Sequence, residues 1–237
     1  MAMAYDVDLI IFDCDGTLVD SEYLNCLSFA QVLNSIGLEE YDPEKVLHLF
    51  KGRKFKNVME QLSVMHDRDF PDDLNKKYID QVAINRKTYL KPVHGTHQVI
   101  SNLAHTHKIC VGSNGEYQNI VSSLSQTGLK NHFPDHMIFN AAMVKHPKPE
   151  PDLFLHAAEK LNTKPERTLV IEDTSTGANA AVAAGMPVIG FTGTAEVIEQ
   201  REDELTKSGV NTLVHEFCDI LRFIKGTVHN TEDKAAC

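Results

Sequence analysis

The chain has 237 residues, of which 42% are apolar and 24% are charged, the balance of an ordinary globular protein. Its formal net charge of −10 argues against sequence-independent nucleic-acid binding, because such binding needs a basic face that displaces counterions. No apolar stretch approaches the length of a transmembrane helix, the first residues lack the basic start of a signal peptide, and the cysteines contain no CxxC pair. We therefore expect a cytoplasmic protein without nucleic-acid or membrane partners and without a disulfide framework.

The first predicted elements are one strand and then a run of helices. Residues 7–12 form a short apolar run that ends at an aspartate, which predicts a buried strand. Residues 21–90 carry apolar side chains at helical spacing, with Ser21 as the expected cap of the first helix and Gly37 at its end. Further helices are expected at 43–51, 54–66 and 71–90. Because this stretch has no convincing strand, residues 21–90 are predicted to form an inserted all-helical cap domain.

Beyond Pro92, strands alternate with helices. The expected strands are 109–112, 137–140, 168–171, 188–191 and 212–215. The expected helices are 97–105, 116–128, 151–161, 177–184, 195–208 and 217–224. This alternation predicts right-handed crossovers and an α/β, Rossmann-like, mostly parallel sheet with helices on both faces. The core would comprise residues 1–20 and 91–226, followed by a disordered tail at 227–237.

Polar side chains follow several of these strands, at the end of the sheet where open α/β folds bind ligands. They are Asp13 and Asp15 after the first strand, Ser113 and Asn114 after the strand at 109–112, and Glu172 and Asp173 after the strand at 168–171. Lys148 lies in a proline-rich loop just before a predicted helix. Parallel strands would bring all of these groups to one rim of the sheet.

The residue types at this rim suit phosphoryl transfer. Crowded carboxylates repel one another unless a cation neutralises them, and an all-oxygen set suits Mg²⁺. A metal-bound carboxylate can attack a phosphate ester and form an aspartyl-phosphate, while a second carboxylate protonates the leaving oxygen and then activates water. A lysine and a hydroxyl–amide pair can hold the phosphoryl oxygens. The pattern therefore predicts a Mg²⁺-dependent phosphohydrolase of a small phosphate ester.

Four motifs in this order resemble the haloacid-dehalogenase-like phosphatase superfamily over nearly the whole chain. They are Asp13-x-Asp15-Gly16-Thr17, Ser113-Asn114-Gly115, Lys148-Pro149, and Glu172-Asp173 followed by Gly177, Ala181 and Ala184-Gly185-Met186. The resemblance implies that Asp13 is the nucleophile and a metal ligand, and that Asp15 is the general acid/base with its carbonyl on the metal. It implies that Asp173 binds Mg²⁺, with Glu172 reaching it directly or through water. It also implies that Ser113 and Lys148 bind the phosphoryl group, helped by the backbone around Asn114.

The position of the helical insert resembles the branch of sugar-phosphate phosphatases and β-phosphoglucomutases. Where a β-phosphoglucomutase carries a histidine and a cap arginine, this chain has Asn25 and Phe55, which favours hydrolysis over phosphoryl transfer to a second sugar. The turn Phe50-Lys51-Gly52 and the motif Ser113-Asn114-Gly115 are more similar to bacterial 6-phosphogluconate phosphatases, so a phosphorylated sugar acid is an expected substrate. The basic segment of the cap includes Lys51, Gly52 and Arg53. These three cap residues are candidate specificity residues that would meet a second anionic group. The alternative is that they form a solvated helix start.

Two other functions stay open at this point. One is a β-phosphoglucomutase-type mutase, and the other is a non-catalytic member that binds a phosphorylated metabolite. We expect the cap to open and close through linkers near 20–21 and 90–92, and we favour a monomer slightly. The histidines His94, His97, His105 and His107 are interpreted as surface side chains rather than as a metal site.

Overall fold

The computed structural model describes residues 4–50, 55–195 and 197–225. The chain divides into two compact units, a core unit of Met1–Asp20 with Lys91–Cys237 and a helical unit of Ser21–Leu90. The predicted tail at 227–237 lies outside the described residues. Within the described part of the chain, no helix is long and apolar enough to cross a membrane.

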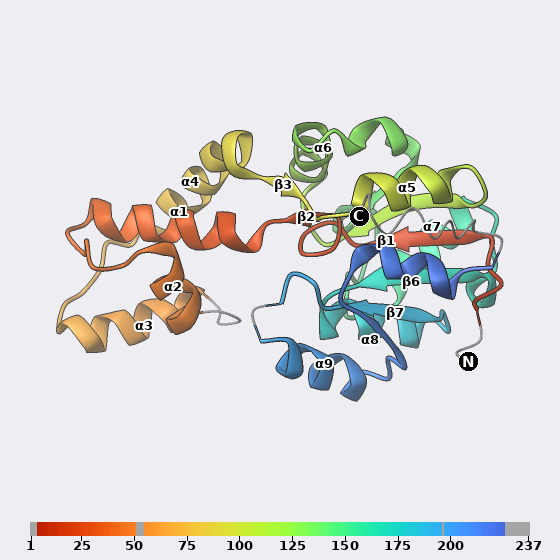
Figure 1. Ribbon diagram of the computed structural model, residues 1–237. Helices are drawn as coiled ribbons and strands as arrows, with labels where there is room; N and C mark the ends of the chain where they lie inside the picture. Colours follow the sequence, from red (N-terminus) through yellow and green to blue (C-terminus); the bar gives the residue numbers. More distant parts are fainter. Residues whose placement is uncertain (1–3, 51–54, 196, 226–237) are drawn as a thin grey trace. The chain divides into compact units, whose positions relative to one another are not determined.

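The core unit contains a six-stranded sheet in the order β5-β4-β1-β6-β7-β8 (Figure 1). The strands are β1 Leu9–Phe12, β4 Lys108–Ser113, β5 Ile138–Asn140, β6 Thr168–Glu172, β7 Val188–Phe191 and β8 Thr212–Val214. Every neighbouring pair is parallel, so the predicted parallel α/β sheet is confirmed. Because β1 lies between β4 and β6, the polar residues that follow these three strands share one rim.

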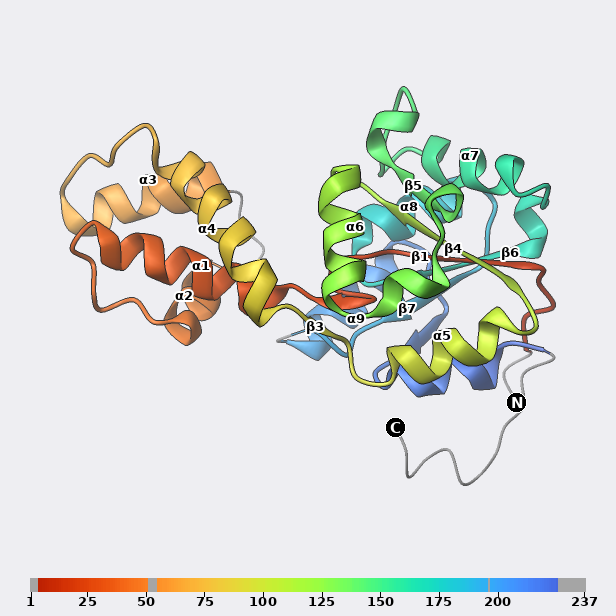
Figure 2. The same ribbon diagram turned by 90° about the horizontal axis from the view of Figure 1, so that it is seen from above.

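Helices cover both faces of this sheet (Figures 1 and 2). The α-helices are α5 Thr96–Ala104, α6 Tyr117–Gln126, α7 Asp152–Lys160, α8 Ser175–Ala183 and α9 Ile198–Lys207. The 3₁₀ segments are η1 Leu129–His132, η2 Asp135–Met137, η3 Ala141–Met143, η4 Pro165–Arg167 and η5 Phe217–Phe223.

Alternate side chains of β1 pack against the helical layers on opposite faces of the sheet. Leu9 and Ile11 belong to the apolar core that also contains Leu153 of α7 and residues of α8 and α9. Phe12 points the other way, where its ring lies 6.4 Å from that of Phe133 and 6.3 Å from that of Phe217. A strand buried on both faces has no polar positions along its length, which is why it reads as a continuous apolar run.

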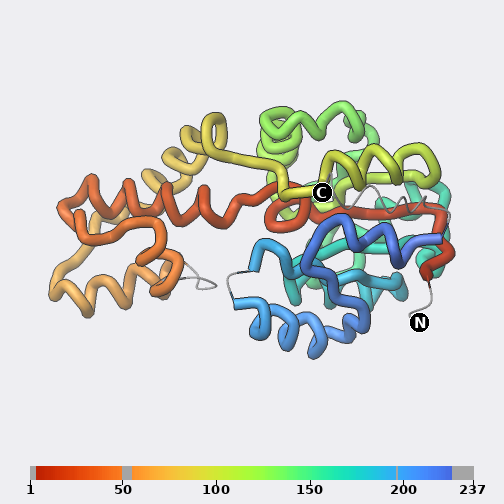
Figure 3. Tube along the Cα trace, in the orientation of Figure 1, coloured from red at the N-terminus to blue at the C-terminus, as the bar shows by residue number. Residues whose placement is uncertain are grey.

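The two linkers between the units form a short antiparallel pair that the sequence pattern does not predict. β2 is Val19–Asp20 and β3 is Lys91–Pro92, and they pair where the chain leaves the core unit and re-enters it (Figure 3). Two residues in each strand are too few to show a periodic pattern of apolar side chains.

Four local predictions differ from the structure in type or by more than two residues. Ser21 was expected to cap the first helix, but its backbone lies in the helical region and its side chain makes no cap hydrogen bond. A capping residue needs an extended backbone, which Ser21 lacks. The predicted helix at 217–224 is the 3₁₀ segment η5. The helices predicted from 71 and from 195 begin instead at Leu74 and at Ile198.

The helical unit consists of α1 Glu22–Ser35, α2 Pro43–Phe50, α3 Phe55–His66 and α4 Leu74–Tyr89. Gly37 has the predicted role at the end of α1, since its φ is 85° and the next N–H, from Leu38, reaches back to the Leu33 carbonyl at 3.1 Å. An aromatic cluster of Phe29, Phe55 and Tyr78 lies inside the unit, with the Phe55 and Tyr78 rings stacked 5.7 Å apart.

Candidate active site

The chain turns sharply after β1 and leaves Asp13 at the rim of the sheet. The N–H of Asp13 donates to the Ile171 carbonyl of β6 at 3.0 Å, so the residue continues the sheet by one step. The loop then folds back, because the N–H of Gly16 reaches the Val19 carbonyl at 2.8 Å. Gly16 has a φ of 86°, a conformation that L-residues with a Cβ rarely adopt.

Asp173 packs directly over this turn. A Cβ added at Gly16 would lie 2.4 Å from Oδ2 of Asp173, so only glycine leaves room for the carboxylate. The Thr17 hydroxyl donates to Oδ1 of Asp173 at 3.0 Å. The first and fourth motifs are therefore in contact, with the carboxylate of Asp173 fixed from two sides.

Lys148 links Asp13, the predicted nucleophile, to the fourth motif. Its Nζ lies 2.6 Å from Oδ1 of Asp13 and 2.8 Å from Oε1 of Glu172. The lysine is buried, although its neighbours Pro147 and Pro149 are exposed. A buried ammonium between two carboxylates is compensated by both charge and hydrogen bonds.

Asn114 holds the loop that carries this lysine. Its Nδ2 donates to the Lys148 carbonyl at 2.9 Å, and its Oδ1 accepts from the Lys148 N–H at 3.1 Å. The amide side chain is thus engaged with the protein, which leaves the Asn114 backbone as the part that the resemblance assigns to phosphate.

Glu172 uses both of its oxygens within the protein. Oε1 faces Lys148, and Oε2 accepts the N–H of Thr174 at 2.7 Å and its hydroxyl at 2.9 Å. A Cβ at Gly177 would lie only 1.7 Å from Oε1, so the glycine of the fourth motif makes room for this side chain. Thr174, rather than Glu172 or Asp173, caps α8 through the N–H of Gly177 at 3.1 Å.

Ser113 and Asp15 both lie next to Gly115 at the rim. Ser113 ends β4 and is buried, and its Oγ accepts the N–H of Gly115 at 3.1 Å. A Cβ at Gly115 would lie 3.3 Å from Oγ of Ser113 and 3.9 Å from Oδ2 of Asp15. The second motif is therefore next to the predicted general acid/base.

Burial dominates the electrostatics of the site. Desolvation raises the pKa of Asp13 to about 7, against the attraction of Lys148, and Glu172 and Asp15 add repulsion. Desolvation, with repulsion from Glu172 and Asp13, also raises the pKa of Asp173 well above its ordinary value. Burial alone would lower the pKa of Lys148, but its attraction to Asp13 and Glu172 raises it instead.

The residues fit a hard divalent cation such as Mg²⁺. Asp13 and Asp173 are buried carboxylates that repel each other, and a bound cation would reverse the rise in their pKa values. Among the described residues, no group of three or more His, Cys, Asp or Glu side chains is arranged to hold a metal. The set implied by the resemblance adds to these two side chains the Asp15 carbonyl and Glu172, which would reach the metal directly or through water.

The haloacid dehalogenase-like hydrolase family matches residues 10–191. The chain belongs to this family. It is 31% identical to 6-phosphogluconate phosphatase of Escherichia coli strain K12 over 186 residues, which cover 78% of this chain and 82% of that one. The family predicted from the four motifs is thereby confirmed.

Solved structures of the family have the same fold. A conserved haloacid dehalogenase-like protein of unknown function from Agrobacterium tumefaciens is 32% identical, with a TM-score of 0.77 over 90% of this chain and 96% of that chain. A family hydrolase from Deinococcus radiodurans, solved with phosphate and sodium bound, is 27% identical, with a TM-score of 0.79 over 91% of this chain and 94% of that chain.

Most of the predicted site residues meet at one place in this hydrolase. The structure brings Asp13, Lys148, Glu172 and Asp173 into direct contact or close approach, and Ser113, Asn114 and Asp15 border them. The predicted specificity residues Lys51, Gly52 and Arg53 lie outside the described residues.

Sequence reasoning missed two side chains that contact the site. The Thr194 hydroxyl, from the loop after β7, donates to the Gly16 carbonyl at 2.7 Å. Arg201 of α9 donates from Nη1 to the Asp173 carbonyl at 2.7 Å, and the same atom lies 3.9 Å from Oδ2 of Asp173. An arginine in the first turns of a charged helix carries no spacing signal that could have identified it.

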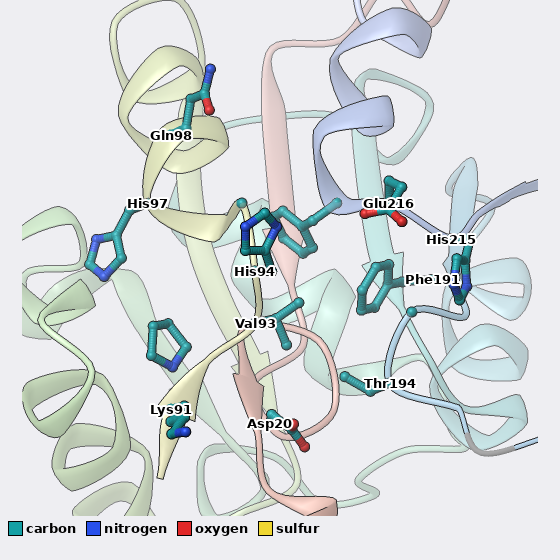
Figure 4. A pocket seen from close by; sticks show the side chains of 14 residues that line it. Asp20, Lys91, Val93, His94, His97, Gln98, Phe191, Thr194, His215 and Glu216 are labelled. Atoms are coloured by element: carbon teal, nitrogen blue, oxygen red, sulfur yellow. The ribbon is translucent and has the colours of Figure 1, made fainter. Parts of the chain in front are cut away.

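A cavity of about 640 Å³ also opens on the core unit (Figure 4). It is lined by β2, β3, the start of α5 and the segments that follow β7 and β8, and its polar side chains include His94, His215 and Glu216. None of the predicted catalytic, phosphate-binding or metal-binding residues lines it, so it is not the predicted active site. Thr194 connects the two places, because it lines the cavity and bonds to Gly16.

Proposed function

We propose that this hydrolase is a Mg²⁺-dependent phosphatase that cleaves a small phosphorylated sugar or sugar acid through a phosphoryl group carried on Asp13. The observation that carries the proposal is the position of Lys148, 2.6 Å from Asp13 and 2.8 Å from Glu172, beside the buried Asp173. A cation fixed next to a carboxylate at a strand end suits the phosphoryl group of a substrate that arrives in front of that carboxylate.

Each protein group then has a defined task. Asp13 attacks phosphorus, and Asp15 gives a proton to the leaving sugar oxygen and later takes one from the attacking water. Lys148 and Ser113 hold the phosphoryl oxygens, whose negative charge must be balanced in the transition state. When bound, Mg²⁺ would be held by Asp13, Asp173 and the Asp15 carbonyl, and it would supply charge that offsets the repulsion between nucleophile and phosphate.

Glu172 is proposed to orient Lys148 rather than to bind the metal directly. Its two oxygens already accept three hydrogen bonds from Lys148 and Thr174. A direct metal bond would cost at least one of these contacts in a buried place. The alternative of a water-mediated contact stays compatible with this geometry.

Two observations support a phosphatase over a mutase. Phe55, at the position where a mutase would carry a sugar-binding arginine, stacks on Tyr78 inside the helical unit. The relative from Escherichia coli is named for the hydrolysis of 6-phosphogluconate. We therefore propose a phosphorylated sugar acid as the first substrate to test, with mutase action or ligand binding without turnover as the competing outcomes.

A substrate panel tests this function. Purified chain is assayed for release of inorganic phosphate from 6-phosphogluconate, from hexose phosphates and from β-glucose 1-phosphate, with Mg²⁺ and with EDTA. We expect Mg²⁺-dependent phosphate release, fastest with the sugar-acid phosphate. Formation of glucose 6-phosphate from β-glucose 1-phosphate would identify a mutase, and binding without turnover of any compound would identify a non-catalytic member.

The cap segment is tested with the same assay. If Lys51 and Arg53 meet a second anionic group, replacing both with Ala raises KM for 6-phosphogluconate by at least about tenfold and changes KM for p-nitrophenyl phosphate little. Equal changes in both KM values would remove the case for a specificity role of this segment.

A further inference from the structure

Two side chains outside the four motifs hold the main chain on the predicted metal side of the site. Thr194 donates to the carbonyl of Gly16 at 2.7 Å, and Arg201 donates to the carbonyl of Asp173 at 2.7 Å. Gly16 and Asp173 are themselves packed against each other. Thr194, which follows β7, and Arg201, which lies in α9, therefore each hold one half of this contact.

The carbonyl of Asp173 depends on such a partner because of its place in the chain. β6 ends at Glu172 and α8 begins at Ser175, so Asp173 lies between two regular hydrogen-bond patterns. Arg201 supplies a charged donor at this point, and charge-assisted hydrogen bonds are among the stronger ones in proteins.

Arg201 is itself well anchored. Its side chain is only 20% exposed, and it projects from the first turn of α9. Leu205, one turn later, is fully buried, and a Cβ at Gly190 of β7 would lie 3.0 Å from its Cδ1. The helix is thus fixed to the sheet close to the guanidinium, which favours a set position over a mobile surface side chain.

We propose that Arg201 is a positioning residue for Asp173, and that Thr194 has the matching task for the Gly16 turn. Together they keep the Asp173 carboxylate in its binding position before a cation arrives. The inference rests on the proposed function, because it takes Asp173 as a Mg²⁺ ligand. Partners of ligand residues commonly change metal affinity about 10- to 100-fold when they are removed.

The positive charge of Arg201 allows an experiment to distinguish a positioning role from a purely electrostatic one. Nη1 lies 3.9 Å from Oδ2 of Asp173, so its positive charge repels a divalent cation bound there. If charge were its only influence, loss of Arg201 would tighten metal binding. If it positions the ligand, loss of Arg201 weakens metal binding. The two roles predict opposite signs.

The experiment measures Mn²⁺ binding to the full chain without substrate, from the paramagnetic resonance signal of free Mn²⁺. Arg201→Ala and Thr194→Val are compared with wild type. Arg222→Ala is the matched control, because this substitution removes the same charge at an exposed arginine that pairs with Asp219 at 2.9 Å. We expect the Kd for Mn²⁺ to rise about tenfold in Arg201→Ala, to rise by a smaller factor in Thr194→Val and to stay unchanged in Arg222→Ala.

Catalysis supplies a second measurement. In Arg201→Ala the Mg²⁺ concentration for half-maximal activity should rise about tenfold, while kcat at saturating Mg²⁺ changes by less than about threefold. Unchanged or tighter Mn²⁺ binding in Arg201→Ala overturns the proposal. Should that variant not fold, Thr194→Val decides in the same way, since it replaces a hydroxyl by a methyl of similar size. Failure of wild type to bind Mn²⁺ would instead overturn the proposed function itself.

Discussion

Nζ of Lys148 lies 2.6 Å from Oδ1 of Asp13, and both side chains are buried. The pair joins the first motif to the third across the rim of the sheet. It also sets the charge balance of the site, because Lys148 faces Glu172 as well. Removing a member of this arrangement has consequences for both stability and catalysis.

Replacement of Lys148 with Met should be costly in both respects. The substitution leaves two buried carboxylates without their cation, and breaking a buried pair in this way costs about 3 kcal/mol or more. Phosphate release should fall at least about 100-fold, since the proposed charged contact to the phosphoryl group is lost. Urea unfolding and phosphate release measure the two effects. Lys145→Met, at an exposed lysine nearby, should change neither.

Glu172 and Asp173 should respond differently to loss of charge. Asp173→Asn removes a proposed metal ligand and should weaken Mn²⁺ binding at least about tenfold. Glu172→Gln keeps the shape of the side chain but leaves one acceptor oxygen where Glu172 has two, so either Lys148 or Thr174 loses its acceptor. We expect kcat to fall while Mn²⁺ affinity changes by less than about threefold. Equal losses of Mn²⁺ affinity in both variants would mean that Glu172 binds the metal.

The pH dependence of stability follows from Asp13. Burial raises its pKa to about 7 in the folded chain, whereas an Asp in an unfolded chain has a pKa of about 4. Between these values the folded chain binds more protons than the unfolded chain, so metal-free stability should fall as the pH rises through this window. Asn at this position cannot ionise.

Melting in EDTA across this range tests the effect. Asp13→Asn should melt at a higher temperature than wild type at about pH 8, and the difference should shrink toward about pH 5. Asp72→Asn, at an exposed position, serves as the control. A constant difference between Asp13→Asn and wild type at all pH values would show that Asp13 titrates normally.

Gly177→Ala should destabilise the chain although alanine is the better helix former. The added Cβ would lie 1.7 Å from Oε1 of Glu172, so the carboxylate must move away from Lys148. Helix propensity favours alanine by about 1 kcal/mol, and a lower melting temperature would show that displacement of Glu172 outweighs it. The exposed Asn179→Ala in the same helix should raise the melting temperature slightly.

The parts of the fold that could be predicted are those with strong local patterns. β1, β4 and β6 each contain a short apolar run, and the polar residues at or after the ends of these runs predicted a shared rim because parallel strands end together. The pair β2–β3 could not be predicted, since two residues in each strand show no period. Apolar spacing predicted a helix at η5 but not its 3₁₀ form, because 3₁₀ runs of this length are uncommon.

The sequence predicted which residues belong to the site better than it predicted the contacts between their side chains. The motifs indicated that Lys148 and Glu172 belong to the site, but not that Glu172 faces the lysine, because that depends on the space left at Gly177. Arg201 lies 28 residues from Asp173 in the chain, and only the packing of α9 brings it there.

The most direct test of the central claim is to trap the phosphoryl group on Asp13. The chain is mixed with Mg²⁺ and a substrate that it hydrolyses, quenched in acid during turnover and reduced with borohydride, which converts an aspartyl-phosphate to homoserine. We predict homoserine at position 13 in the wild-type peptide and none when substrate is omitted. Turnover with unmodified Asp13, or modification at another carboxylate, would contradict its role as the nucleophile.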